Sequence, residues 1–267
     1  MKKVIYSCIT GGYDDVPVHK YVAPDWDYVL FTDNKELIAK GRCAHWIIRP
    51  LVFNKLTNVK NNRWHKINTH KLFPEYDVSI YLDGNIIVNN SGLFKVVEKL
   101  IADNVLIGVP NHPHRKCIYD EAKVIKKRKI DLPKIVNAEI KVLKADKYPK
   151  KNGLSENNIL FRQHNKIQNT LDLWWNMVET YSKRDQLSFC YALWKTNIKY
   201  VPIYTDEQGF GIHHKKDGDF TFVHSQSHNH DPIVRTKHIP KNIGKILCLF
   251  IPIAKYRNRF KDKYIKD

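Results

Sequence analysis

The stretch Ser79-Ile80-Tyr81-Leu82-Asp83-Gly84-Asn85-Ile86-Ile87-Val88 places a carboxylate and an amide between two apolar runs. The first run is typical of a buried β-strand that ends at the polar triplet. By itself the triplet favours an ordinary hairpin turn. It is also suited to a metal–diphosphate site, since Mg²⁺ and similar ions take hard oxygen ligands. Asp83 and Asn85 lie on the same side of an extended chain, and Gly84 lets the backbone approach an ion closely.

Other short apolar runs bounded by turn residues predict strands at 4–9, 28–32, 46–48, 78–82, 105–109, 200–203 and 220–223. Helices are predicted at 59–72, through much of 123–151 with a restart at Pro133, at 167–181 and at 186–195. Strands that alternate with helices predict an α/β domain with a mainly parallel sheet. Ligands of such sheets bind beyond the carboxyl ends of the strands, where the polar clusters 10–14, 33–34 and 83–85 fall.

The segment before residues 79–88 is basic. Arg63, Lys66 and His70 are spaced i, i+3 and i+7, which places them on one face of the predicted helix. Such a face, directed at the strand ends, could hold a diphosphate through charge-assisted hydrogen bonds. A solvated basic surface is the simpler explanation in so positive a chain, and the nearby triplet is what favours a binding site.

Composition sets limits on the class of protein. The chain has 267 residues, 43% of them apolar, which is enough for one sizeable α/β core. A net charge of +18 favours polyanionic partners: nucleic acid, an anionic membrane surface or phosphorylated substrates. Five scattered cysteines without a C-x-x-C pair favour a reducing compartment over a disulfide framework. The N-terminal apolar stretch is too short for a signal peptide core, and no apolar run approaches the length of a membrane-spanning helix, so a soluble or peripheral protein is expected.

Four blocks follow one another along residues 2–195. They are His-Lys-Leu-Phe-Pro-Glu-Tyr-Asp-Val-Ser-Ile-Tyr-Leu-Asp-Gly-Asn at 70–85, Cys-Ile-Tyr-Asp-Glu-Ala at 117–122, Gly-Leu-Ser-Glu-Asn-Asn-Ile-Leu-Phe-Arg-Gln-His-Asn at 153–165, and Ser-Lys-Arg-Asp-Gln-Leu-Ser-Phe at 182–189. Together they resemble the core signature of the TOD1/MUCI70 glycosyltransferase-like family. The resemblance implies a GT-A-like single domain with a Rossmann-like, mainly parallel sheet. It also implies transfer of a sugar from a nucleotide-sugar donor.

The resemblance assigns roles to particular side chains. The block 83–85 stands in for a metal-binding Asp-x-Asp, with Asn85 in place of the second Asp, and would bind Mn²⁺ or Mg²⁺. Nucleotide-sugar contacts are expected from seven residues: Thr10, Gly11, Tyr13, Asp33, Arg63, Lys66 and Asp83. Catalytic candidates are Asp185, Gln186 and Asn157. Asp185 would serve an inverting enzyme as general base, or it could equally cap the following helix.

Histidines gather late in the chain, at 213, 214, 224, 228 and 230. Because GT-A enzymes often use a late histidine as a further metal ligand, the resemblance points to His224, with His228 as second choice. Taken alone, such a cluster is more often an exposed polar loop.

The composition changes after residue 231. Residues 1–231 are expected to form the glycosyltransferase domain, and 232–267 a basic amphipathic tail. Ten Lys and Arg against two Asp, around the apolar stretch 243–253, suit the surface of an anionic membrane. A helix that closes the core is the alternative. The tail predicts a cytoplasmic protein attached peripherally to the inner face of the membrane.

The predicted function is therefore metal-assisted transfer of a sugar, a hexose from a UDP-sugar by preference, to a glycan or lipid-linked glycan acceptor in surface polysaccharide synthesis. Nucleic acid is not an expected partner, because no RRM, KH, helix-turn-helix or zinc-finger pattern occurs. The basic surface keeps a nucleic-acid-binding protein as the alternative. Because Asn85 replaces the second Asp, an inactive sugar-binding relative is a second alternative. A nucleotide-sugar hydrolase is the third.

Overall fold

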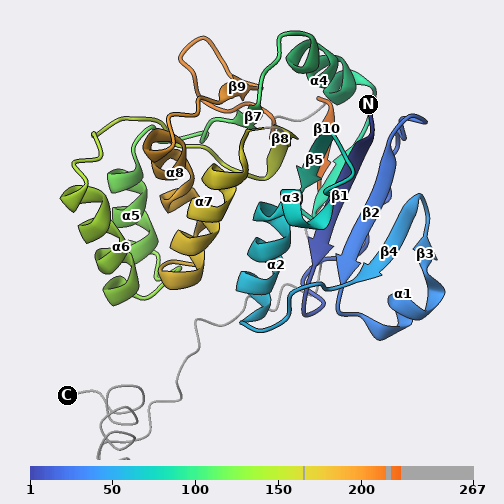
Figure 1. The fold of residues 1–267 in the computed structure, drawn as a ribbon, viewed down its shortest axis with the longest axis horizontal. Coiled ribbons are helices and arrows are strands. Elements are labelled where there is room, and N and C mark those ends of the chain that lie inside the picture. The colour runs from blue at the N-terminus through green and yellow to red at the C-terminus, as the bar shows by residue number, and fades with distance from the viewer. Residues whose placement is uncertain (165, 215–217, 224–267) are drawn as a thin grey trace, which may run out of the picture. The chain divides into compact units, whose positions relative to one another are not determined.

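A central sheet organises the part of the chain that the computed structural model describes, residues 1–164, 166–214 and 218–223 (Figure 1). Its strand order is β3-β4-β2-β1-β5-β8-β7-β9, and a second, two-stranded sheet pairs β10 with β6. The strands are β1 (Lys3–Ile9), β2 (Asp27–Thr32), β3 (Arg42–Cys43), β4 (Trp46–Pro50), β5 (Val78–Leu82), β6 (Ile86–Val88), β7 (Ile107–Pro110), β8 (Ile159–Gln163), β9 (Val201–Ile203) and β10 (Phe220–Phe222).

The first half of the sheet is parallel. β4, β2, β1 and β5 run in the same direction, so their carboxyl ends meet at one edge. β8 is antiparallel to β5 and pairs Ile159 with Leu82, which brings the segment before β8 to that same edge. The predicted mainly parallel α/β architecture is confirmed. Polar residues that follow β1, β2 and β5, and those that precede β8, lie at this edge, where ligands of such sheets bind.

The side chains of β1 alternate between the two faces of the sheet, and both faces are covered. Val4, Tyr6 and Cys8 join one hydrophobic cluster, whereas Ile5 and Ile9 join the other. Successive strand side chains point to opposite faces, and a strand covered on both sides reads as a continuous apolar run. This is why β1 carried no polar alternation in the sequence.

Helices cover both faces (Figure 1). The cluster around Tyr6 takes side chains from α2, α3, α5, α6, α7 and α8, and the cluster around Ile5 takes them from α4 and the two-stranded sheet. The helices are α1 (Lys35–Lys40), α2 (Asn58–Ile67), α3 (Thr69–Leu72), α4 (Gly92–Ala102), α5 (Ile118–Lys127), α6 (Pro133–Ala145), α7 (Gln168–Thr180) and α8 (Phe189–Lys195), with a 3₁₀ turn η1 (Asp185–Leu187). Among the described residues, no helix combines the length and the hydropathy needed to cross a bilayer.

The prediction of one continuous helix at 59–72 is wrong, because the chain breaks at Asn68. A continuous helix would bond the carbonyls of Lys66 and Ile67 to later backbone N–H groups. Instead the buried Arg162 Nη1 donates to both carbonyls, at 2.7 and 3.3 Å, and the Tyr6 hydroxyl donates to the Lys66 carbonyl at 3.0 Å. The break turns His70 away from the face that carries Lys66, and its Nε2 lies 3.3 Å from Asp172 Oδ1.

The remaining differences are local. The predicted helix at 186–195 is the turn η1 followed by α8, and the sequence reading omitted β3, β6, β8, α1 and α4. The hairpin interpretation of 83–85 is also wrong. β6 does not return along β5 in the described structure but pairs with β10, so the triplet leads from one sheet into the other. The restart at Pro133 is confirmed, since α6 begins there. The tail 232–267 lies outside the described residues.

Candidate active site

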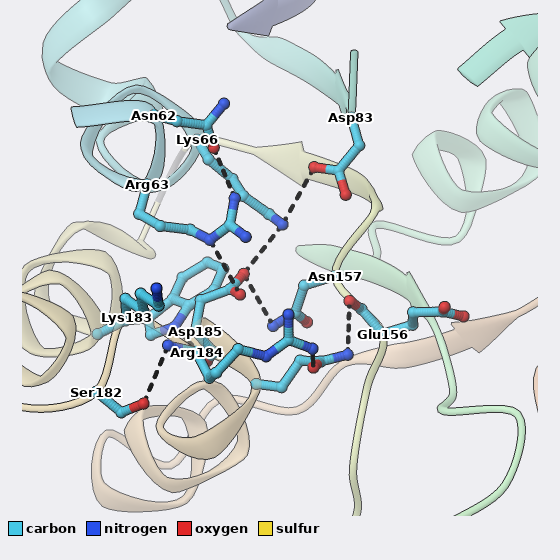
Figure 2. Close-up of polar contacts among 12 residues, drawn as sticks. Asn62, Arg63, Lys66, Asp83, Glu156, Asn157, Ser182, Lys183, Arg184 and Asp185 are labelled. Atoms are coloured by element: carbon cyan, nitrogen blue, oxygen red, sulfur yellow. Dashed lines mark hydrogen bonds and ion pairs between the residues drawn. The ribbon is translucent and has the colours of Figure 1, made fainter. Parts of the chain in front are cut away.

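Lys66 connects two carboxylates at the carboxyl edge of the parallel strands (Figure 2). Its Nζ lies 3.4 Å from Asp83 Oδ1 and 3.0 Å from Asp185 Oδ2, and its side chain is 2% exposed. Asp83 follows β5, Asp185 begins η1, and Lys66 comes from the last turn of α2. A buried ammonium group requires such partners, because desolvation alone strongly disfavours the charge. Three segments far apart in the sequence therefore converge on one charged cluster.

Asp185 is the centre of that cluster. Its Oδ1 lies 3.3 Å from Arg63 Nε, and its Oδ2 accepts from Asn157 Nδ2 at 3.4 Å. Burial alone would raise the pKa of Asp185, but the charges of Lys66, Arg63 and Arg184 outweigh it and lower the pKa to about 2. The carboxylate is thus ionised throughout the physiological range.

The local geometry bears on both predicted roles of Asp185. The capping role is wrong, because Arg184 occupies the N-cap position of η1 and no side chain makes a capping hydrogen bond there. A general base works best with a pKa near the working pH. A carboxylate with a pKa of about 2 that pairs with two cations is a weak base. The geometry favours a fixed negative charge that orients Lys66 and Arg63.

Asn157 and Gln186 are both buried beside Asp185. Asn157 adopts a left-handed backbone with φ 63°, which asparagine tolerates better than most residues, and this conformation turns its amide toward Asp185. The Gln186 amide is held at both ends: Nε2 donates to the Glu156 carbonyl at 3.0 Å, and Oε1 accepts from Arg184 Nη2. The three catalytic candidates from the sequence are brought together.

The predicted nucleotide-binding loop lies where β1 and β2 end. The Gly11 N–H donates to both carboxylate oxygens of Asp33, at 3.0 and 2.8 Å, and the Thr10 hydroxyl donates to the Asn58 carbonyl at 2.9 Å. Gly11 has φ 64°, and a Cβ there would lie 2.2 Å from Asn58 Nδ2, so only glycine fits. Asp33 therefore fixes the loop to the end of β2, and Thr10 fixes it to the start of α2. The role of Asp33 toward a nucleotide stays a prediction.

Tyr13 links this loop to the charged cluster. Its side chain is exposed, and its pKa is raised by partial burial and by the Asp14 and Asp83 carboxylates, while Arg63 and Arg184 oppose the rise. The phenol therefore lies within electrostatic reach of both guanidinium groups. An exposed aromatic ring next to a cationic cluster is suited to stacking on a nucleotide base.

A divalent cation fits the edge at residues 83–85. Asp83 is 32% exposed in its side chain and shares one oxygen with Lys66. A Cβ at Gly84 would lie 3.0 Å from Asp14 Oδ2, so a second carboxylate comes close to the triplet. Hard oxygen donors of this kind suit Mg²⁺ or Mn²⁺, and Asn85 lies in the turn beside them. The third predicted ligand, His224, and its substitute His228 lie outside the described residues.

Comparison with known proteins identifies the family of this chain. Residues 29–209 match the family model described as TOD1/MUCI70, glycosyltransferase-like domain. The chain belongs to the TOD1/MUCI70 family. A probable hexosyltransferase MUCI70 of Arabidopsis thaliana is 24% identical over 214 residues, which are 70% of this chain and 36% of that protein. The chain thus spans about a third of the length of this relative.

Two solved structures are similar in fold to this TOD1/MUCI70 domain. The WbbM bifunctional glycosyltransferase has a TM-score of 0.41 and 12% identity, over 76% of this chain and 38% of that one. Mouse xyloside xylosyltransferase 1 also has a TM-score of 0.41, with 7% identity, over 76% of this chain and 84% of that one.

Sequence reasoning missed one cation of the charged cluster. Arg184 stands in the block 182–189, from which only Asp185 and Gln186 were predicted as site residues. Its guanidinium bonds to Gln186, contributes to the low pKa of Asp185, and keeps a buried Nε without a hydrogen-bond partner among the described residues. The position of Arg184 directly before Asp185 could have indicated it, since a basic residue next to a buried acid in a turn commonly shares its surroundings.

Proposed function

We propose that this chain is a glycosyltransferase that moves a sugar, a hexose by preference, from a nucleoside-diphosphate donor such as a UDP-sugar. Membership of the glycosyltransferase-like family and the likeness to a probable hexosyltransferase support the reaction class. The arrangement of Lys66 between Asp83 and Asp185 carries the proposal. The diphosphate of the donor is inferred from the charges of this cluster, and the hexose from the likeness to a probable hexosyltransferase.

The charge of the cluster suits a diphosphate. Arg63, Lys66 and Arg184 bring three positive charges against the two carboxylates of Asp83 and Asp185. The three cations attract an anion, and hydrogen bonds between charged groups are the strong ones. Preorganised cations also stabilise negative charge that grows on a leaving group, without reorganising during the reaction. The diphosphate would lie over Lys66 and Arg184, with the base toward Tyr13 and the loop at Gly11.

Asp83 and Asn85 would hold Mn²⁺ or Mg²⁺, which when bound would neutralise charge on the departing nucleoside diphosphate. Asp83 serves that ion and also keeps Lys66 oriented by ion pairing. In the donor complex, Lys66 would shift its hydrogen bonding from Asp83 toward phosphate while Asp185 keeps the ammonium in place.

Asp185, Gln186 and Asn157 would face the sugar end of the donor. Asp185 supplies a fixed negative charge, which stabilises positive charge that develops at the anomeric carbon. Gln186 and Asn157 keep this carboxylate and Arg184 aligned through the hydrogen bonds described above.

The acceptor is proposed to be a glycan or a lipid-linked glycan of a surface polysaccharide. The basic composition of 232–267 supports attachment to an anionic membrane on its cytoplasmic face.

A thermal-shift panel of UDP-, GDP-, CMP- and dTDP-sugars, each with and without Mn²⁺, tests the proposal, because a ligand that binds the native state raises the apparent stability by mass action. A UDP-sugar with Mn²⁺ is expected to give the largest shift, and product sugar should then appear on an added glycan. Free sugar alone would indicate a hydrolase. No shift with any donor, together with salt-sensitive binding of nucleic acid, would support the alternative of a nucleic-acid-binding protein.

A further inference from the structure

A second group of metal-ligating side chains lies beside the charged cluster. Glu156, His213 and His214 each offer a ligand atom, and these atoms lie within 4.8 Å of one another. Glu156 precedes β8, and the histidines follow β9 on the connection to β10. The His213 ring is fully buried, whereas His214 is exposed. Figure 2 shows the Glu156 side chain pointing away from Asp185 and Asp83.

His213 Nε2 faces a carboxylate oxygen on one side and an amide nitrogen on the other. Nε2 lies 2.8 Å from Glu156 Oε2 and 2.9 Å from Asn158 Nδ2. With a proton it donates to the carboxylate but faces the amide N–H groups. Without one it accepts from the amide but faces the lone pairs of the carboxylate. Turning the Asn158 amide removes this conflict, because Oδ1 then accepts from a protonated Nε2 or joins Nε2 and Oε2 on a shared cation.

The spacing is close to that of two ligands on one ion. Bonds of about 2.0–2.2 Å from zinc to nitrogen and oxygen place neighbouring ligand atoms of a tetrahedral shell about 3.3–3.6 Å apart. Nε2 and Oε2 lie 2.8 Å apart, so the two side chains would separate slightly to admit an ion, and a turn of the exposed His214 ring brings in a second nitrogen. A half-turn of the Asn158 amide exchanges Nδ2 for Oδ1, a buried oxygen without a hydrogen-bond partner in the described part of the chain. Two nitrogens and two oxygens complete a four-ligand shell.

His112 is close to this group but is excluded as a ligand. Its Nδ1 accepts from the backbone N–H groups of His114 and Arg115, at 3.0 and 3.1 Å. Its Nε2 lies 3.0 Å from Arg115 Nη2, and that guanidinium also bonds to Glu121. Both ring nitrogens are therefore engaged by groups that a metal ion would have to displace.

We propose that Glu156, His213 and His214, with Asn158 as a supporting ligand, form a second cation site for a first-row transition metal ion such as Zn²⁺. Imidazole and carboxylate donors together suit such ions better than Mg²⁺. The ion fixes the connection before β10 to the segment that carries Asn157. It does so next to Gln186, whose amide donates to the Glu156 carbonyl at 3.0 Å.

The test measures Zn²⁺ binding to the full chain after treatment with a chelator, by calorimetry with the metal alone and no donor present. Wild type is expected to bind one equivalent that is lost or weakened at least about 10-fold in Glu156→Gln, His213→Gln and His214→Gln, since loss of even a supporting contact costs that much. His214 is exposed, so His214→Gln tests the site even where His213→Gln fails to fold. His114→Gln, at an exposed histidine nearby, is the matched control and should bind as wild type does.

Asp83→Asn separates this site from the donor site. It should keep the Zn²⁺ equivalent, whatever it does to sugar transfer, so failure of the proposed function does not affect the result. The proposal is overturned by any of three results: no bound equivalent in wild type, wild-type affinity in Glu156→Gln and His214→Gln, or loss of the equivalent in Asp83→Asn. Co²⁺ substitution gives a second readout, because the visible absorption of a four-coordinate ion should disappear in the same variants.

Discussion

Asp185→Asn is the most informative single change in the charged cluster. The substitution keeps the shape and one hydrogen-bond acceptor of the side chain but removes the charge that faces Lys66 and Arg63. Lys66 then keeps Asp83, at 3.4 Å, as its remaining carboxylate. We expect the variant to be less stable than wild type at neutral pH.

The size of the effect follows from the pKa of Asp185. Burial raises this pKa, but Lys66, Arg63 and Arg184 lower it overall, from 3.8 to about 2. At 1.36 kcal/mol per pH unit, the ionised carboxylate stabilises the fold by about 2 kcal/mol. Because the pKa is depressed, this stabilisation is complete above about pH 4 and is lost as the pH falls toward 2. In the variant, Lys66 and Arg63 stay buried with less negative charge around them, which should lower the free energy of unfolding by about 1–2 kcal/mol more.

Urea unfolding at pH 7 and at several values down to pH 3 measures this difference, with far-UV circular dichroism as the signal. The control is Asp172→Asn, which removes a half-exposed carboxylate 2.6 Å from Lys71 Nζ and should cost less than about 1 kcal/mol. The gap between wild type and Asp185→Asn should narrow as the pH falls. A loss no larger than in the control, or a gap that stays constant with pH, refutes the reasoning.

Three further predictions concern single residues around the site. Lys66→Met should weaken UDP binding about 10- to 100-fold in calorimetry, since a hydrogen bond to a charged group contributes about 1.5–3 kcal/mol. Unchanged affinity for UDP would show that Lys66 does not bind the donor. Gly84→Ala would place a Cβ 2.9 Å from Ile9 Cγ1 and 3.0 Å from Asp14 Oδ2. This crowding should lower the free energy of unfolding, measured in urea, by about 1–3 kcal/mol. Burial raises the pKa of Glu139 from 4.5 to about 8, so the free energy of unfolding of wild type should fall as the pH rises through this interval. Glu139→Gln should lack this fall and be more stable than wild type by more than about 1 kcal/mol at pH 8. Stability curves of the two proteins that run parallel with pH would contradict this.

The parallel half of the sheet could be predicted because its signal is local. β1, β2 and β5 are short apolar runs that end in polar residues, and a fully buried strand requires no more than that. β8 escaped prediction because it carries Arg162, which reads as a surface residue. Its guanidinium is buried instead, since it bonds to the Tyr6 hydroxyl and the carbonyls at the end of α2.

The break at Asn68 shows the same limit. Local spacing predicts a continuous helix, and the contact that ends it comes from Arg162, which is 96 residues from Lys66 in the chain. The candidate site was predictable as residue types at strand ends, since Thr10, Asp33 and Asp83 each follow an apolar run. The ion pairs of Asp185 with Arg63 and Lys66 were not, because only the folded chain brings η1 to α2.

A crystal structure of the full chain with UDP and Mn²⁺, with anomalous diffraction to locate the metal, tests the donor site most directly. We predict a manganese peak within bonding distance of an Asp83 carboxylate oxygen and a pyrophosphate in contact with Lys66 and Arg184. A nucleotide bound elsewhere on the chain, with Lys66 still closed between Asp83 and Asp185, would contradict the account.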